Sequence, residues 1–365
     1  MATLSPSVPT PEGDGAADDA GSFARSRGRA ARVALFVAGI VLAIALFRLV
    51  GWPAIAANLE RIGPLRFGFL VALYSLTQAA FAFGWWLVID PLPPAREMPH
   101  LFAVYLAGDS WNYAAPGGVA GEPVKARLLG KHTGTGSALA SLTLHKHADL
   151  VAQWAFVSAG VAYAAWRFPI GTAARVAAAA GAAGLGALLL LLTWAMRRGT
   201  YAPIVRRLAR WKFLARRLER YQHSAEAIDQ RILAFSAHRG RYVASVAVCF
   251  AGWCGGMLET WLILRFLAPG AGWGTALAVE SLSMALNNML LFVPGRVGSA
   301  EGVRTAVFVL LGLPAAQGLA YGLVRRGREL LWTIPGFAAL VRWHALDLAR
   351  PQAARRPTQA PGASR

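Results

Sequence analysis

The sequence predicts an all-α integral membrane protein, with about six transmembrane helices plus two re-entrant helical hairpins in an inverted repeat. Hydrophobic residues make up 56% of the 365 positions and charged residues only 15%. Several apolar stretches exceed the ~20 residues that cross a bilayer as a helix. Basic residues gather in the loops between these stretches, and a broken, polar motif occurs twice inside the apolar sequence. These observations together predict the membrane fold and its internal repeat.

The repeated motif combines a Pro-Gly break with a carboxylate. The first copy occupies Pro116–Lys125 and the second occupies Pro294–Arg304, about 180 residues later. Both contain Pro-Gly, a Val two residues on, small residues, a Glu, and then Val followed by a base; the second has one extra residue before its Glu. Broken, polar, repeated segments at membrane depth are typical of transporter binding sites. The correspondence extends to the flanks: Asp109-Ser110 with Asn287-Asn288, and His145–Leu150 with Arg325–Leu330.

Charge predicts the topology. Residues 1–31 lack apolar periodicity and are predicted to be a disordered cytoplasmic tail, 32–343 the membrane domain, and 344–365 a second cytoplasmic tail. The segment 197–241 holds twelve arginines and lysines against three acids. Because cytoplasmic loops are enriched in Lys and Arg, we expect this loop and both termini in the cytoplasm of a bacterial inner-membrane protein.

The apolar segments follow this topology. Full spans are predicted at 33–50, 65–89, 137–166, 171–196, 242–266 and 316–341. Shorter segments form the two hairpins, 100–115 with 121–131 and 273–293 with 301–313. Three full spans separate the hairpins, so the hairpins must enter from opposite faces, within repeat halves around 100–150 and 275–330. Non-helical backbone at membrane depth is tolerated only when it is buried or lines a wet cavity.

The hairpins supply the chemistry that a lipid headgroup requires. Helix N-termini bind phosphate, glycines let backbone approach a ligand, and bases neutralise it. Glu122 and Glu301 could hold an amine, balance the bases or carry a coupling proton. The predicted substrate-binding and transport residues are Asp109, Asn112, Pro116, Gly117, Gly118, Gly121, Glu122, Lys125, Arg127, Lys146, Asp149, Asn287, Asn288, Pro294, Gly295, Arg296, Gly298, Glu301, Arg304 and Arg325.

Structural interpretations of the same residues remain open. A Pro-Gly break can be a simple kink, and a Glu early in a half-helix can be a cap that complements the helix dipole. His145, Lys146 and Asp149 share a helix face and could be a solvated cluster at the interface. Glu259 and Glu280 have no repeat partner and could serve packing or pairing.

The pattern resembles the membrane domain of lysylphosphatidylglycerol synthases and of the flippase-like proteins that share it without the synthase. That family has an early Pro-Gly, small residues, Arg, Leu-Leu and Arg-x-x-Asp, and later Pro-Gly-x-x-Gly…Glu. The corresponding residues here are Pro116-Gly117, Gly121, Arg127, Leu128-Leu129, Lys146 and Asp149, then Pro294-Gly295, Gly298, Glu301 and Arg325. Lys146 replaces an Arg, Arg296 fills a usual Gly position, and Ser299-Ala300 lengthens the second motif.

The resemblance covers residues 33–343 and implies a stand-alone domain that translocates lipid, because we expect no synthase domain after the last span. We expect a phospholipid, polyprenyl- or hopanoid-type lipid with an anionic or phosphate-bearing headgroup. The formal charge of +19 lies in interspan loops, so we expect membrane rather than nucleic-acid partners.

Two other functions compete: a lipid-modifying enzyme, or an accessory subunit that recruits a cytoplasmic protein through the basic loop. The chain contains no His-Glu-x-x-His spacing and no evident Ser or Cys nucleophile motif. We therefore expect no catalytic residues, no metal and no cofactor, and we interpret Cys249 and Cys254 as packing residues.

Overall fold

The computed structural model describes residues 52–114, 120–199, 228–289 and 298–349, together with a few single positions, and side chains as far as Trp343. Five long helices are α2 (Trp52–Leu87), α5 (Thr135–Arg167), α6 (Thr172–Arg198), α9 (Arg239–Leu267) and α12 (Ala315–Ala349). Two pairs of shorter helices are α3 (Met98–Ala114) with α4 (Gly121–Thr133), and α10 (Trp273–Met289) with α11 (Ser299–Leu310). Short 3-10 turns occupy Ala95–Glu97 and Phe235–His238. The predicted helical class is thereby confirmed for the described residues.

Helix boundaries follow the predicted segments, with two differences. The first is that the residues from Trp52 to Ile62 are also helical; α2 is kinked at Gly63, where φ is 65°, and its second part begins at Pro64, beside the predicted start at 65. Glycine tolerates that backbone conformation, and proline fits the first turn of a helix. α12 continues to Ala349, past the predicted end at 341. The predicted span 33–50, the Pro-Gly breaks and most of the basic loop lie outside the described residues.

In the described part of the chain, three helices are long and apolar enough to cross a membrane: Pro53–Leu87, Thr172–Arg198 and Arg239–Leu267. Helices α5 and α12, with 33 and 35 residues, are also long enough for a ~30 Å hydrocarbon core. Their hydropathy is lower because they carry charged side chains, among them Asp149 on α5 and Arg325 on α12. Those charges lie inside the bundle, as the next section shows.

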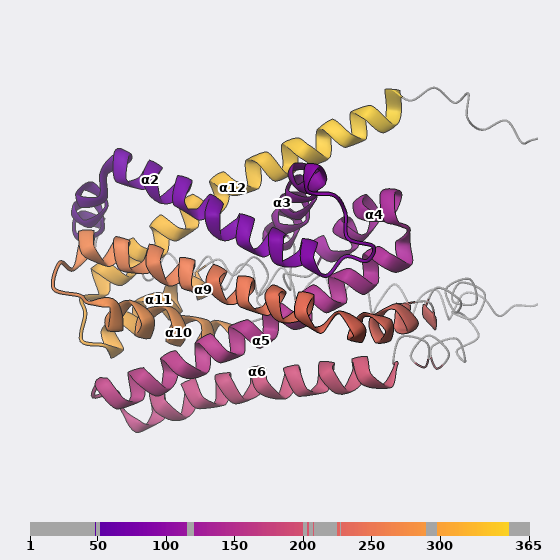
Figure 1. The fold of residues 1–365 in the computed structure, drawn as a ribbon. Helices are drawn as coiled ribbons and strands as arrows, with labels where there is room; N and C mark the ends of the chain where they lie inside the picture. Colours follow the sequence, from indigo (N-terminus) through magenta and orange to yellow (C-terminus); the bar gives the residue numbers. More distant parts are fainter. Residues whose placement is uncertain are drawn as a thin grey trace, which may run out of the picture.

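Helix contacts repeat between the two halves of the chain. α2 of the first half packs along α9 of the second. α3 contacts α12, and correspondingly α10 contacts α5. In the same way α2 contacts α12 and α9 contacts α5. Within each half, α4 packs on α5 as α11 packs on α12. The α3–α4 pair lies toward one end of the long helices and the α10–α11 pair toward the other (Figure 1). α6 has no counterpart among these contacts and lies outside α5 and α10.

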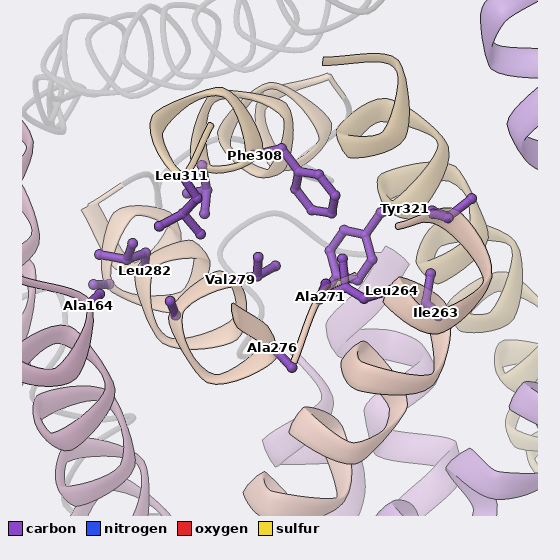
Figure 2. Packing of buried hydrophobic residues seen from close by; sticks show 14 of the residues in the cluster. Ala164, Ile263, Leu264, Ala271, Ala276, Val279, Leu282, Phe308, Leu311 and Tyr321 are labelled. Atoms are coloured by element: carbon purple, nitrogen blue, oxygen red, sulfur yellow. The ribbon is translucent and has the colours of Figure 1, made fainter. Parts of the chain in front are cut away.

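Apolar side chains form two clusters, one toward each end of the bundle. The first includes Ile263, Val279, Phe308 and Tyr321, which converge from α9, α10, α11 and α12 (Figure 2). The second includes Trp85, Val104, Leu129 and Ala138 from α2, α3, α4 and α5. In a membrane domain such clusters are stabilised by close van der Waals packing, because lipid tails are as apolar as these side chains. Between the two clusters the helices carry polar residues instead.

Candidate functional site

A polar cavity of about 390 Å³ lies between the two apolar clusters. Helices α2–α5 and α9–α12 all contribute to its walls. On α9 the lining positions fall between the stretches that belong to the two clusters, whereas on α5 His145, Lys146 and Asp149 lie among residues of the second cluster. Because burying an unpaired charge is costly, the polar contacts inside this cavity determine what it can bind.

A close approach between α3 and α4 builds one wall. A Cβ on Gly121 would lie 1.8 Å from the Gly108 carbonyl oxygen, so only glycine fits. The Asn112 side chain accepts a 2.7 Å hydrogen bond from the Gly121 backbone N–H and donates at 3.1 Å to Glu122. Lys125 Nζ lies 3.1 Å from Glu122 Oε1 and 4.5 Å from the Tyr105 ring centroid. The beginning of α4 is thus held against α3 by a close backbone contact, by the Asn112 hydrogen bonds and by the contact of Lys125 with the Tyr105 ring.

Helix α5 contributes a second ion pair. Lys146 Nζ lies 3.1 Å from Asp149 Oδ2, and Trp253 Nε1 donates to Asp149 Oδ1 at 3.2 Å. The Lys146 side chain is 55% exposed, whereas the Lys125 side chain is 5% exposed. Because Lys146 lines the cavity, its ammonium is the more accessible of these two cations. His145, one position earlier, also lines the cavity, and its Nδ1 has no hydrogen-bond partner.

The second half of the chain supplies two more pairs at the cavity wall. Arg325 pairs with Glu280, and the Glu280 carboxylate also accepts hydrogen bonds from Thr260 at 2.7 Å and Tyr321 at 3.0 Å. Arg304 lies 3.3 Å from Glu329. The contacts come from α9, α10, α11 and α12, so this wall is charged and largely compensated.

A deeper ion pair supports that wall. Arg328 and Glu259, with side chains 1% and 2% exposed, lie 3.2 Å apart. The Arg328 guanidinium also stacks 3.5 Å from the Tyr74 ring centroid and lies 3.6 Å from Glu329. Glu259 and Glu280, which have no repeat partner in the sequence, thus both serve as pairing residues.

The structure brings together half of the predicted site residues. These line the cavity: Asp109, Asn112, Glu122, Lys125, Lys146, Asp149, Asn287, Asn288, Arg304 and Arg325. Arg127 is exposed on α4 and does not line it. Gly121 and Gly298 act at the starts of α4 and α11. Pro116, Gly117, Gly118, Pro294, Gly295 and Arg296 lie outside the described residues.

Glu301 has a different environment from Glu122. Its Oε2 accepts a 2.8 Å hydrogen bond from the Gly298 backbone N–H, and its Oε1 lies 2.8 Å from Arg326 Nε. Arg326 donates in turn to Tyr113 at 2.7 Å. Glu301 is the third residue of α11, the position from which a Glu side chain can reach back to the N-cap. It is buried, and it is not among the residues that line the cavity.

Several lining residues were not predicted as site residues. They are Tyr74, Thr77, Gln78, Phe81, Tyr105, His145, Gln153, Gly252, Trp253, Gly256, Glu280, Ser283, Met284 and Glu329. Glu329 could have been predicted as a site residue, because it corresponds to Asp149 at a shift of 180 residues. The α2 and α9 residues carry no repeated motif, so only the packing of these two helices reveals their role.

The sequence was compared with known protein families, curated proteins and solved structures. The family model described as the lysylphosphatidylglycerol synthase TM region matches residues 30–336. The chain belongs to this family. The match includes every helix that lines the cavity and extends through Arg325 and Glu329 on α12. No curated protein and no solved structure matches the chain. Membership in the lysylphosphatidylglycerol synthase transmembrane family makes this a membrane protein of lipid metabolism or translocation.

Proposed function

We propose that this family member translocates a membrane lipid with an anionic, phosphate-bearing headgroup across the bacterial inner membrane. The observation that carries the proposal is the cavity itself, in which charged residues from both repeat halves meet inside an otherwise apolar bundle. Charged residues inside a membrane domain are costly and mark ligand or ion pathways. Family membership places the chain among proteins that handle membrane lipids.

The dimensions of the cavity fit a headgroup rather than a whole lipid. Small-molecule sites occupy ~300–1,000 Å³, and 390 Å³ lies at the lower end of that range. The acyl, prenyl or hopanoid tail would stay among the helices and the surrounding bilayer. The proposal therefore covers phospholipid, polyprenyl- and hopanoid-type lipids, since the cavity would recognise only their phosphate end.

The half-exposed ammonium of Lys146 is the best placed cation for that phosphate. Arg304 and Arg325 lie on the opposite repeat half and carry guanidinium groups suited to bidentate contact. Both already pair with carboxylates, so a phosphate would have to exchange with or join these pairs. Such exchange would let the charges of both repeat halves contact one headgroup at a central site, the position that transporters with alternating access use.

The helix contacts support an inverted repeat with two re-entrant hairpins. The α3–α4 and α10–α11 pairs lie toward opposite ends of the long helices, and each packs on the last helix of the other half. Three long helices, α5, α6 and α9, separate the two hairpins in the chain. An odd number of crossings inverts the second half relative to the first, so the central cavity would open to either side in turn.

Lipid movement in liposomes tests the function. Purified protein reconstituted with a fluorescent phosphatidylglycerol should equilibrate the probe between leaflets, and the recovered lipid should be chemically unchanged. The matched control is the double variant Lys146→Gln/Arg325→Gln, which should insert but lose most of the movement. A probe that stays in its original leaflet contradicts the proposal, and a chemically altered probe would favour the enzyme alternative.

Cysteine labelling tests the orientation. Gly240 and Gly270 are both surrounded by open space, with no atom within 4 Å of an added Cβ. In a background with Cys249 and Cys254 replaced by Ser, an impermeant maleimide applied to intact cells should label Gly270→Cys and spare Gly240→Cys. Labelling of both sites, or of Gly240→Cys alone, would contradict cytoplasmic termini.

A further inference from the structure

We propose that Asp109 binds a proton that enters the cavity together with the anionic headgroup, so that lipid movement is coupled to the proton gradient. The inference rests on the proposed function for the identity of the headgroup. It assigns the coupling role to a residue other than Glu122 or Glu301, each of which lies within 3.1 Å of a base.

The charge balance of the cavity singles out Asp109. Among the described lining residues, five carboxylates face four permanently basic side chains. Four carboxylates take part in ion pairs with those bases, and Asp109 does not. Its side chain accepts a 3.1 Å hydrogen bond from the Gln78 amide. The pairs are Glu122 with Lys125, Asp149 with Lys146, Glu280 with Arg325, and Glu329 with Arg304.

Other polar atoms at the cavity also point to a ligand. His145 and Ser283 are 7% and 4% exposed, and both line the cavity. His145 Nδ1, Ser283 Oγ and Asn288 Nδ2 have no hydrogen-bond partner in the protein. Since buried polar groups are usually satisfied, these atoms indicate groups that a bound headgroup or its water would engage.

The repeat provides an internal comparison for Asp109. Its equivalent in the second half is Asn287, which lines the same cavity. Asn is nearly isosteric with Asp but carries no charge and does not titrate in the physiological range. The position therefore carries a polar side chain of this size in both halves and an ionisable one in the first half only.

A carboxylate and an anionic headgroup in one cavity repel each other, and protonation removes the repulsion. The headgroup therefore favours the protonated form of Asp109, and by linkage the proton favours headgroup binding to the same extent. In this step a proton from water adds to the Asp109 carboxylate as the headgroup enters. The proton leaves to water on the other side when the headgroup leaves. Lipid and proton thus move in the same direction.

Several other groups surround Asp109 and need controls. Tyr74, Tyr105 and Lys146 interact with it electrostatically, from α2, α3 and α5. The remaining charged or titratable cavity residues on the packed helices are Glu122, Lys125, His145, Asp149, Glu280, Arg304, Arg325 and Glu329. His145 is the one that ordinarily titrates near neutral pH, so it is the rival proton acceptor.

Calorimetry with the full chain in detergent tests the inference. The probe is dihexanoyl phosphatidylglycerol, whose phosphate stays ionised between pH 5.5 and 8.5, titrated in buffers of different ionisation enthalpy. The wild-type protein should take up close to one proton when it binds the lipid. Its Kd for the lipid should rise by up to about tenfold for each unit by which the pH is increased. Asp109→Asn should bind without proton uptake and with a flat pH profile. His145→Gln should keep the uptake.

A second variant uses the repeat. Asn287→Asp adds the mirrored carboxylate, so binding should weaken at alkaline pH and proton uptake should exceed that of the wild type. Proton uptake that persists in Asp109→Asn, or wild-type binding with no uptake, overturns the inference while leaving lipid translocation standing. Absence of binding in every folded variant overturns the proposed function as well.

A pH gradient across liposomes gives the corresponding transport result. When the liposome lumen is more acidic than the outer solution, the wild-type protein should drive the labelled lipid toward the outer, alkaline side. Asp109→Asn should lose this response to the gradient. Wild-type lipid movement that ignores the gradient would show a passive translocase and contradict proton coupling.

Discussion

Glu122 and Glu301 occupy equivalent places in two copies of one motif, but their surroundings differ. Glu122 is the second residue of α4, its side chain is 33% exposed, and it lines the cavity beside Lys125. Glu301 is the third residue of α11, its side chain is 7% exposed, and it joins the N-cap to Arg326. The extra residue in the second motif causes this difference, because it moves the carboxylate to the position from which it can cap. Equivalent residues in a repeat can therefore have separate roles.

The largest effect on stability is expected when the capping carboxylate of Glu301 is removed. Glu301→Ala should remove the buried carboxylate that pairs with Arg326, at a cost of up to ~3–5 kcal/mol, and should remove the cap on Gly298. We expect a large loss of thermal stability in detergent, measured by fluorescence-detected size exclusion. The double variant Glu301→Gln/Arg326→Gln should recover part of it, since both charges of the pair are then removed. An unchanged melting temperature in Glu301→Ala would contradict the structural role.

Glu122→Gln should show the opposite pattern. The side chain is partly exposed and Asn112 can still bond a Gln, so stability should fall by much less than in Glu301→Ala. Loss of a charge-assisted contact of ~1.5–3 kcal/mol should reduce lipid movement roughly 10–100-fold. Liposome assays at matched protein content measure this. Equal losses of stability in the two variants would remove the distinction drawn above.

Lys146 should have a smaller effect because it is half exposed and its charge is partly screened. Lys146→Gln should weaken binding of a short-chain anionic lipid roughly 2–10-fold. Lys146→Arg, which introduces the family's usual residue, should stay within a few-fold of wild type and can gain affinity through bidentate contact. A Lys146→Gln variant with wild-type affinity would place the phosphate elsewhere in the cavity.

The smallest effect is expected at Arg127, which matches the family motif but is exposed on α4 away from the cavity. Arg127→Gln should change binding and transport by less than about twofold, within the ±0.5 kcal/mol typical of surface substitutions. A loss as large as that of Glu122→Gln would show that the motif's Arg acts outside the cavity described here.

Much of the helical framework could be predicted from the sequence. In the described residues, Pro and Gly between apolar runs follow the ends of α4, α5, α6 and α9, and helices occupy the segments between them. Hydropathy was less informative for α5 and α12, since residues such as Asp149 and Arg325 reduce their apolar character. The charges that obscure a span in the sequence are those that build the cavity.

Side-chain direction was the part that sequence could not supply. The motif predicts a carboxylate at Glu122 and at Glu301, but its environment depends on the register of each half-helix and on the helices packed against it. Gln78 on α2 contacts Asp109 because α2 packs against α3, and Trp253 on α9 contacts Asp149 because α9 packs against α5. No pattern along the chain encodes these pairings.

The glycine contact between α3 and α4 also restricts how the protein can move. At 1.8 Å from the Gly108 carbonyl there is no space for even a methyl group on Gly121, and Asn112 bonds across the same junction. The start of α4 is therefore fixed to α3 as one rigid piece that carries Asp109, Glu122 and Lys125 together. Opening the cavity to one side of the membrane would displace this piece as a whole against α2, α5 and α12. Distance measurements between labels on α3 and α4 should then stay constant while those from α3 to α12 change.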